Sequence, residues 1–265
     1  MLMKEIGAVA RFTFIRDVRK SSYWSGIIWP FSVIVLISVF FLEPLYGDSK
    51  GMVVDFKGAE VILAVSVITI GLVFSPIMGS ESEKDRSSKV SDLLWSMSGP
   101  RTQLIGRFLG VILLMIFSMS LYILFFFILN EYSAWLRDAF KAFEPVTGVI
   151  GACLLLQATL WILVLSANIG MLVKNKSHLS QAISVIPAYT IICSVVNAQL
   201  SGESQWGNLI KKMVWGLPVL SQLFEFHRVL IHVDSMLMVL LSVIVQFALW
   251  LVYSWFVLRL YSKYS

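Results

Sequence analysis

The chain has 265 residues, of which 58% are hydrophobic and 14% charged, and its mean hydropathy is +0.82. Soluble domains are usually about 45–50% apolar and about 25% charged. The composition therefore excludes a soluble globular domain, an intrinsically disordered chain and a disulfide-rich secreted scaffold. The net charge of +5 does not indicate a nucleic-acid partner, because the basic residues cluster beside hydrophobic segments.

Residues 1–22 precede the first hydrophobic segment and form an amphipathic pattern. Apolar residues fall on one side of a helical wheel and basic residues on the other, which is typical of a helix lying along a membrane surface. Ordinary basic flanking of a membrane span is an equally good interpretation. The apolar side comprises Leu2, Ile6, Val9, Ala10 and Phe14, and the basic side Lys4, Arg11 and Arg19.

Six hydrophobic segments are long enough to cross a bilayer, whose hydrocarbon core takes roughly 20 apolar residues in a helix. None contains Asp, Glu, Lys or Arg. Because a helix satisfies its own backbone groups in lipid, the sequence predicts an all-α, polytopic membrane protein with one domain, residues 1–265. We expect the first segment to be retained, since it runs at full length into Glu43-Pro44. The predicted spans are 23–42, 61–79, 108–129, 146–173, 179–200 and 235–258.

The basic residues predict the orientation. With the N-terminus placed inside, 14 of the 21 Lys and Arg residues fall on the cytoplasmic side. Cytoplasmic segments of membrane proteins carry an excess of Lys and Arg. We therefore expect both termini in the cytoplasm.

The connection from Ser80 to Leu104 is predicted as a cytoplasmic loop that contains a short amphipathic helix. It opens with a charged cluster that includes Glu81 and Glu83, and Gly99-Pro100 ends the helix. Such a helix fits a groove on a partner protein, or it rests on lipid headgroups. The apolar face repeats at i, i+3, i+4 and i+7 and consists of Val90, Leu93, Leu94 and Met97.

The longest outer connection, Ser201 to Asp234, is only weakly polar. Its apolar stretches, Met213–Leu217 and Val219–Phe226, are separated by Pro218 and are too short to span a bilayer. Short apolar stretches of this kind form re-entrant or interfacial helices. An amphipathic loop on the outer leaflet is the alternative.

The chain lacks the common signatures of catalysis. A phosphate-binding loop would need G-x-x-x-x-G-K-[ST], but Gly202 and Gly207 are followed by Asn208-Leu209. His227 and His232 are five residues apart and fall on roughly opposite sides of a helix, so they are a poor metal pair. We expect no catalytic residue, no metal and no cofactor on this chain.

Three amides within the predicted spans are candidates for a substrate path: Gln157, Asn168 and Asn197. Gln157 and Asn168 are three helical turns apart and share a face. Hydrogen bonding between helices is the commoner use of such residues, and we favour it. The absence of ionisable residues from the spans argues against a proton- or cation-coupled transporter.

Two regions combine into a recognisable pattern. In the first, a charged stretch that begins with glutamate leads to paired leucines, a proline and an arginine, and then a glycine-bearing entry to the third span. In the second, an apolar segment with a central proline precedes the last span. The residues are Glu81 and Glu83, Leu93-Leu94, Pro100-Arg101 and Gly106-Arg107-Phe108-Leu109-Gly110, followed by Leu217-Pro218-Val219-Leu220 with Glu225 and Arg228.

This pattern, together with six spans and two cytoplasmic ends, resembles the permease subunits of type-2 ATP-binding-cassette transporters. The resemblance implies a permease that pairs with a second copy or a paralogue and docks two cytoplasmic ATPase subunits. ATP and magnesium would be held by those ATPases. It also implies export of an amphiphile, such as a peptide, an antibiotic, a lipid or a lipid-linked glycan, across the cell membrane of a prokaryote.

The resemblance implies roles for two sets of residues. The first set would couple the permease to the ATPase through the helix in the cytoplasmic loop, and the second would cap the pathway on the outer side. Paired serines, Ser87 and Ser88, replace the family's usual glycine-threonine before the leucines. The coupling set is Glu81, Glu83, Val90, Leu93, Leu94, Met97, Pro100 and Arg101, and the outer set is Pro218, Glu225 and Arg228.

Two other classes of function stay open at this stage. One is an ion-coupled secondary transporter, which would form no tight complex with a cassette ATPase. The other is a membrane scaffold or an intramembrane enzyme without transport, which would change no ATPase rate on reconstitution.

Overall fold

A computed structural model describes residues 2–21, 23–28, 32, 54–87, 99–132, 145–173, 176–200, 217–230 and 236–264. Within these ranges the ordered structure is helical and contains no strand. The helices are α1 (Leu2–Val18), α4 (Val54–Ser87), α6 (Pro100–Tyr132), α8 (Pro145–Leu172), α9 (Lys176–Leu200), α11 (Leu220–Leu230) and α12 (Met236–Tyr264).

Five of these helices are long and apolar enough to cross a membrane. Their apolar segments are Leu63–Glu83, Arg101–Leu121, Gly148–Leu172, Ser177–Asn197 and Val239–Arg259. The chain is therefore a multi-pass membrane protein of helical architecture, as the hydropathy predicts. The first predicted span, 23–42, lies mostly outside the described residues, so the count of six spans stays a prediction.

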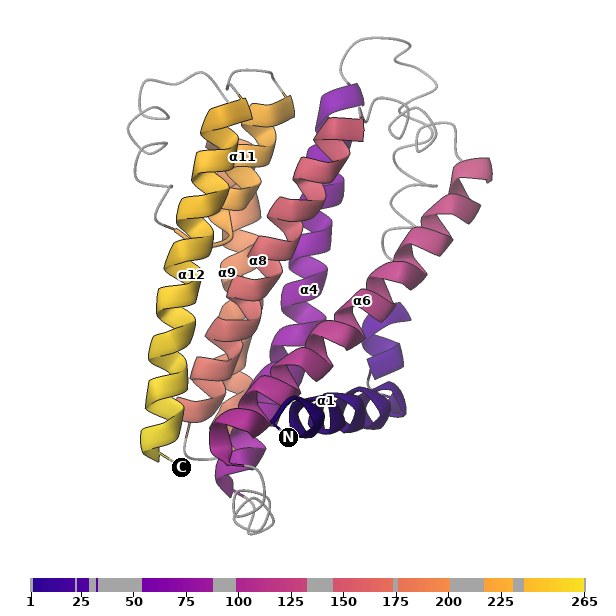
Figure 1. Ribbon diagram of the computed structural model, residues 1–265. Helices are drawn as coiled ribbons and strands as arrows, with labels where there is room; N and C mark the ends of the chain where they lie inside the picture. The colour runs from indigo at the N-terminus through magenta and orange to yellow at the C-terminus, as the bar shows by residue number, and fades with distance from the viewer. Residues whose placement is uncertain are drawn as a thin grey trace.

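The helices α4, α8, α9 and α12 stand side by side, and α6 leans away from them (Figure 1). The helix α1 lies crosswise at one end of this bundle, and both ends of the chain are found there. We call this the α1 end. The helix α4 begins at the opposite end, so the segment between α1 and α4 starts and finishes at opposite ends of the bundle.

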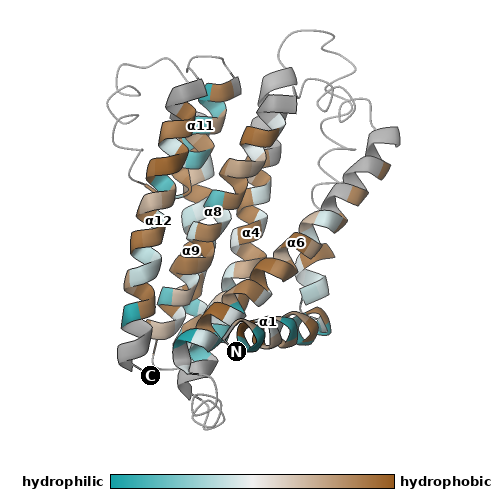
Figure 2. Ribbon diagram, in the orientation of Figure 1, coloured by the Kyte–Doolittle hydropathy of each residue, from teal (hydrophilic) through white to brown (hydrophobic). Residues whose placement is uncertain are grey.

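The core lies around α4 and α8. Among the apolar segments, 56% of that in α4 and 50% of that in α8 is buried, against 17% in α12. Close contact between α4 and α8 depends on Gly170, because a Cβ there would collide with the backbone of Gly79. The upright helices are hydrophobic over most of their length (Figure 2). Much of α12 and α9 therefore faces away from the core, as expected for lipid or another subunit.

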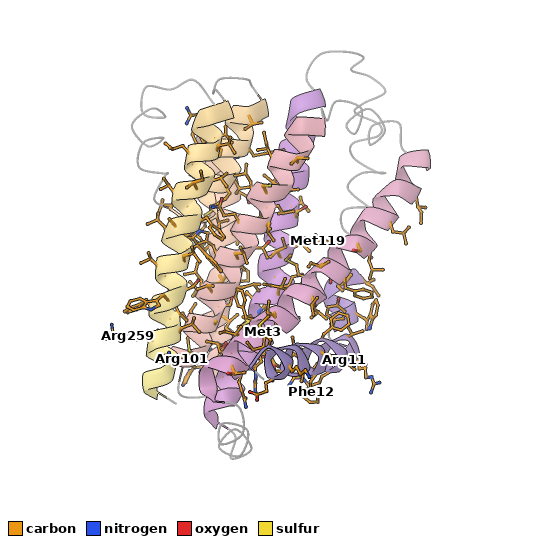
Figure 3. All side chains as sticks on the ribbon, in the orientation of Figure 1. Met3, Arg11, Phe12, Arg101, Met119 and Arg259 are labelled. Atoms are coloured by element: carbon orange, nitrogen blue, oxygen red, sulfur yellow. The ribbon has the colours of Figure 1, made fainter. Side chains whose placement is uncertain are left out.

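The helix α1 packs on the first turns of α6, and two glycines of α6 allow the close approach. Gly106 and Gly110 of α6 lie against α1, so that a Cβ on Gly106 would approach the Val9 Cβ to 2.7 Å, and one on Gly110 the Thr13 Cβ to 2.7 Å. The predicted apolar side of α1 is the side that is covered, with Ile6 and Ala10 buried. On the other side, Arg11 and Phe12 project away from the bundle (Figure 3). The amphipathic pattern at the N-terminus therefore encodes a helix that docks on the bundle.

The prediction that a loop begins at Ser80 is wrong. The helix α4 continues through the charged cluster to Ser87, and α6 already begins at Pro100. Glu and Lys are good helix formers, and the carboxylate of Glu81 is paired inside the protein, so the fall in hydropathy does not end the helix. The predicted coupling helix, with Val90, Leu93, Leu94 and Met97, lies outside the described residues.

Candidate functional site

A buried carboxylate joins three helices at the α1 end. Glu81 of α4 is fully buried and forms an ion pair with Arg16 of α1. Arg107 of α6 lies on its other side, with its Nη1 atom 3.4 Å from Oε2 of Glu81 and 2.7 Å from the Glu81 carbonyl oxygen. A buried charge is tolerated only when it is paired and hydrogen-bonded. The pairing therefore fixes α1, α4 and α6 to one another at a single point.

A second acidic residue extends this cluster along α1. Asp17 is buried, lies 3.2 Å from Nε of Arg16 and forms an ion pair with Lys20. Burial alone would lower the pKa of Arg16, but hydrogen bonds and charges from Asp17 and Glu81 outweigh it and raise that pKa. The guanidinium therefore stays protonated and continues to pair with Glu81. We call Arg16, Asp17, Lys20, Glu81 and Arg107 the ionic cluster.

Aromatic contacts reinforce the attachment of the N-terminal segment to α6. The Tyr23 hydroxyl lies 2.6 Å from Oγ of Ser118 in α6. Phe14 of α1 and Trp24 both pack edge-on against Phe117 of α6, at centroid distances of 6.0 and 6.3 Å. The N-terminal segment is thus held along α6 by polar and aromatic contacts as well as by the ionic cluster.

The other predicted coupling residues within the described ranges are Glu83, Pro100 and Arg101. Glu83 is buried near the end of α4, so a docked protein would not contact it directly. Gly99 adopts a positive φ of 66°, Pro100 is the first residue of α6, and Arg101 is exposed. Of the predicted coupling residues within the described ranges, Arg101 is exposed, whereas Glu81 and Glu83 are internal.

Two of the three candidate path residues form hydrogen bonds between helices. Nε2 of Gln157 in α8 donates to the carbonyl oxygen of Val243 in α12 at 2.9 Å. Nδ2 of Asn168 donates to the Tyr253 hydroxyl, also in α12, at 2.6 Å. With Trp250 Nε1, which donates to the Leu160 carbonyl at 3.0 Å, these bonds form a series between α8 and α12. They favour the packing role over the substrate path.

The third candidate differs. Asn197 is buried near the end of α9, and its Oδ1 has no hydrogen-bond partner in the part of the chain that the structure describes. The structure therefore does not bring Asn197 together with Gln157 and Asn168 through a hydrogen bond among the described residues.

The outer candidates lie in and before α11. Pro218 accepts a hydrogen bond at its carbonyl oxygen from the Tyr189 hydroxyl of α9, and Phe226 packs against Gly151 of α8. Tyr189 lies well inside the apolar segment Ser177–Asn197, so α11 starts level with the interior of the bundle. Glu225 is buried, and Nη1 of Arg228 lies 3.8 Å from its Oε1.

Sequence reasoning missed Arg16, Asp17 and Tyr253 as partners of the candidate residues. The paired residues are separated by 65 positions for Arg16 and Glu81 and by 85 for Asn168 and Tyr253. Hydrophobic periodicity reports only which side of one helix is buried, so it carries no signal for these pairs. One available signal was the charge of Asp17 on the same side of the helical wheel as Ile6 and Ala10.

No protein-family model, no curated protein and no solved structure matches this chain.

Proposed function

We propose that the chain is the permease subunit of an ATP-driven transporter that exports an amphiphilic substrate. In this proposal two cytoplasmic ATPase subunits bind at the α1 end, and a second permease, either the same chain or a paralogue, completes the pathway. The observation that carries the proposal is the buried carboxylate of Glu81, which connects α4 to both α1 and α6.

The position of the ionic cluster supports a coupling role. The helix α4 ends at Ser87 and α6 begins at Pro100, so both helices lead into the connection that carries the predicted docking helix. An ATPase that pushed on this connection would displace α4 and α6 together, because Glu81 holds them to each other. The helix α1 would move with them through Arg16. Rigid elements joined by buried ion pairs are a means of transmitting such a displacement.

The outer half of the bundle supports the second part of the proposal. The helix α11 is packed among α4, α8 and α9, and its start is bonded to the interior of α9 through Pro218. A helix in this position is re-entrant in our proposal and closes the pathway on the side opposite the ATPase. Glu225 and Arg228, paired within α11, would then be polar residues of this cap.

One observation favours the alternative of an ion-coupled transporter. Glu225 is a buried carboxylate in α11, a helix whose start is hydrogen-bonded to Tyr189 inside the apolar segment of α9. Buried carboxylates at membrane depth are typical of proton and cation sites. Such a transporter would need no ATPase, so the two proposals differ in the partner that they require.

The test is affinity purification of the tagged chain from its native membrane in a mild detergent, with mass spectrometry of the proteins that accompany it. A cassette ATPase in stoichiometric amount is the expected result. Any second permease in the complex would identify the pairing. A chain that purified alone in several detergents would contradict the proposal and favour ion coupling at Glu225.

A further inference from the structure

A cavity of about 310 Å³ lies between α6 and α12, with α4 and α8 also contributing to its wall. Its described lining consists of aliphatic, aromatic and thioether side chains, and the hydroxyl of Ser254 is its one polar group. The volume is at the lower end of the range for small-molecule sites, roughly 300–1,000 Å³. An apolar cavity of this kind does not hold water, so its natural occupant is apolar.

The cavity lies at membrane depth and toward the α1 end. Its lining on α6, Leu104–Ile112, comes from the first half of that helix, and its lining on α12, Trp250–Leu258, from the second half. Both stretches fall inside apolar segments long enough to span a membrane. Leu109 lines the cavity and is 40% exposed, so the cavity opens at the surface that faces lipid.

The wall of the cavity is fixed by contacts outside it. The indole of Trp250 donates its Nε1 hydrogen to the Leu160 carbonyl oxygen at 3.0 Å and stacks on Phe247 at a centroid distance of 5.5 Å. Its polar atom is therefore used within the protein. A rotation of Trp250 into the cavity would break this hydrogen bond.

A cation lies beside the mouth of the cavity. Arg101 precedes the lining residues Leu104 and Phe108 by three and seven positions, which places all three on one side of α6. Arg101 is exposed at the α1 end (Figure 3). A lipid whose chain occupied the cavity would bring its phosphate toward this guanidinium.

Arg259, an exposed arginine of α12 at the same end of the bundle, lies on the side of its helix that faces away from the cavity. Arg259 follows Trp250 by nine positions, which is half a turn away from the cavity side at 3.6 residues per turn. It stacks over Trp255 and projects away from the bundle (Figure 3). Arg259 therefore provides a matched control for Arg101. It has the same charge and lies at the same end of the bundle, but on the side of its helix that faces away from the cavity.

The hydroxyl of Ser254 has no hydrogen-bond partner in the part of the chain that the structure describes, although its Oγ is buried. By contrast, Ser118 of α6 and Ser166 of α8 donate to the carbonyl oxygen four residues earlier, at 2.8 and 2.6 Å. The Ser254 hydroxyl is therefore available to donate a hydrogen bond to an acceptor inside the cavity. The ester carbonyl of a phospholipid is such an acceptor.

We propose that this cavity binds an acyl chain of one anionic phospholipid from the leaflet at the α1 end, with the phosphate at Arg101 and an ester oxygen at Ser254. The leaflet follows from the position of the cavity, and the anionic headgroup from the charge at its mouth. The site requires only that the helices span a membrane, so it stands whether or not the chain exports a substrate.

The test is native mass spectrometry of the purified full-length protein in micelles that contain equal amounts of phosphatidylglycerol and phosphatidylcholine. We expect one phosphatidylglycerol per chain to be retained preferentially. Arg101→Gln should weaken its binding about five-fold, the usual effect of one basic residue near an anionic lipid surface. Arg259→Gln should leave the binding unchanged.

A second pair of variants tests the cavity itself. Ala167→Phe places a ring in the cavity and should abolish retention of the lipid, whereas Ala152→Phe, on the exposed side of the same helix, should retain it. If Ala167→Phe does not accumulate, Ser254→Ala tests the same site with little risk to the fold, and should also weaken retention.

Three results would overturn the proposal. Equal loss of lipid in Arg101→Gln and Arg259→Gln would show a general charge effect. Equal retention of the two lipids, unchanged by Ala167→Phe or Ser254→Ala, would show annular lipid only. A homodimer that retained no lipid at any ratio would assign the cavity to a contact between copies of the chain.

Discussion

Arg16 of α1 and Glu81 of α4 form an ion pair in which the carboxylate is fully buried. The two residues are 65 positions apart in the chain, and Arg107 of α6 completes the contact from a third helix. A helix that lies across the end of the bundle is thereby attached to two upright helices by their charges. This attachment is the structural basis of the coupling that we propose.

Replacing Glu81 by Gln should destabilise the protein, because Arg16 and Arg107 would then face each other without a carboxylate. Breaking a buried ion pair costs about 3–5 kcal/mol, and we expect the lower value since Arg16 is partly exposed. The measurement is the midpoint of thermal unfolding in detergent. Glu5→Gln, on α1 but outside the ionic cluster, is the control, and equal midpoints for the two variants would refute the role of the cluster.

Adding a side chain at Gly106 or Gly110 should displace α1 from α6. A Cβ at Gly110 would lie 2.8 Å from the Ala10 carbonyl oxygen, and backbone atoms do not move aside without moving the helix. We expect Gly110→Val to increase cleavage of the N-terminal segment by trypsin. Gly7→Ala, whose added Cβ meets nothing within 4 Å, should leave cleavage unchanged. Protection of the segment in Gly110→Val would contradict the packing described.

The hydrogen bond between Asn168 and Tyr253 allows a packing role of Asn168 to be distinguished from a role in substrate contact. In a packing role, Asn168→Leu and Tyr253→Phe each remove the same hydrogen bond, so their effects on unfolding should not add. The coupling energy should be about 0.6 kcal/mol, the average for hydrogen bonds between membrane helices. Additive effects on stability, together with altered stimulation of the ATPase by substrate in Asn168→Leu alone, would favour the substrate path instead.

Much of the architecture could be predicted from hydropathy alone. The burial of Ile6 and Ala10 follows from the helical wheel, and the close approach at Gly106 and Gly110 follows from their size. Which helix approaches these glycines cannot be predicted in this way, because small residues indicate a close contact but not the helix that makes it. The extension of α4 to Ser87 was hidden by the fall in hydropathy, which signals the end of a span and not the end of a helix.

The candidate site was predicted less well than the fold. The sequence predicts Glu81 as a residue of a cytoplasmic loop, whereas it is an internal residue whose partners come from two other helices. Gln157 and Asn168 are predicted only to share a face of one helix, and their acceptors in α12 lie more than 80 positions further along the chain. Pairings of this kind depend on how the helices assemble.

Leu94→Asp tests the predicted docking helix, which lies outside the described residues. A charge in an apolar docking face must be desolvated when the partner binds, so the variant should release the proposed ATPase while the chain stays folded in the membrane. Ser91→Asp, on a different side of the same predicted helix, is the control and should retain the ATPase. Unchanged recovery of the ATPase with Leu94→Asp would reject this docking face.

The central claim is that this chain is a permease driven by a partner ATPase. The most direct measurement is the rate of ATP hydrolysis in proteoliposomes by the ATPase alone and by the ATPase assembled with this chain. We predict that assembly changes the rate and that Glu81→Gln, in folded preparations, reduces this change. An ATP hydrolysis rate that is the same with and without the chain would contradict the claim. It would favour a membrane protein whose function does not depend on a partner ATPase.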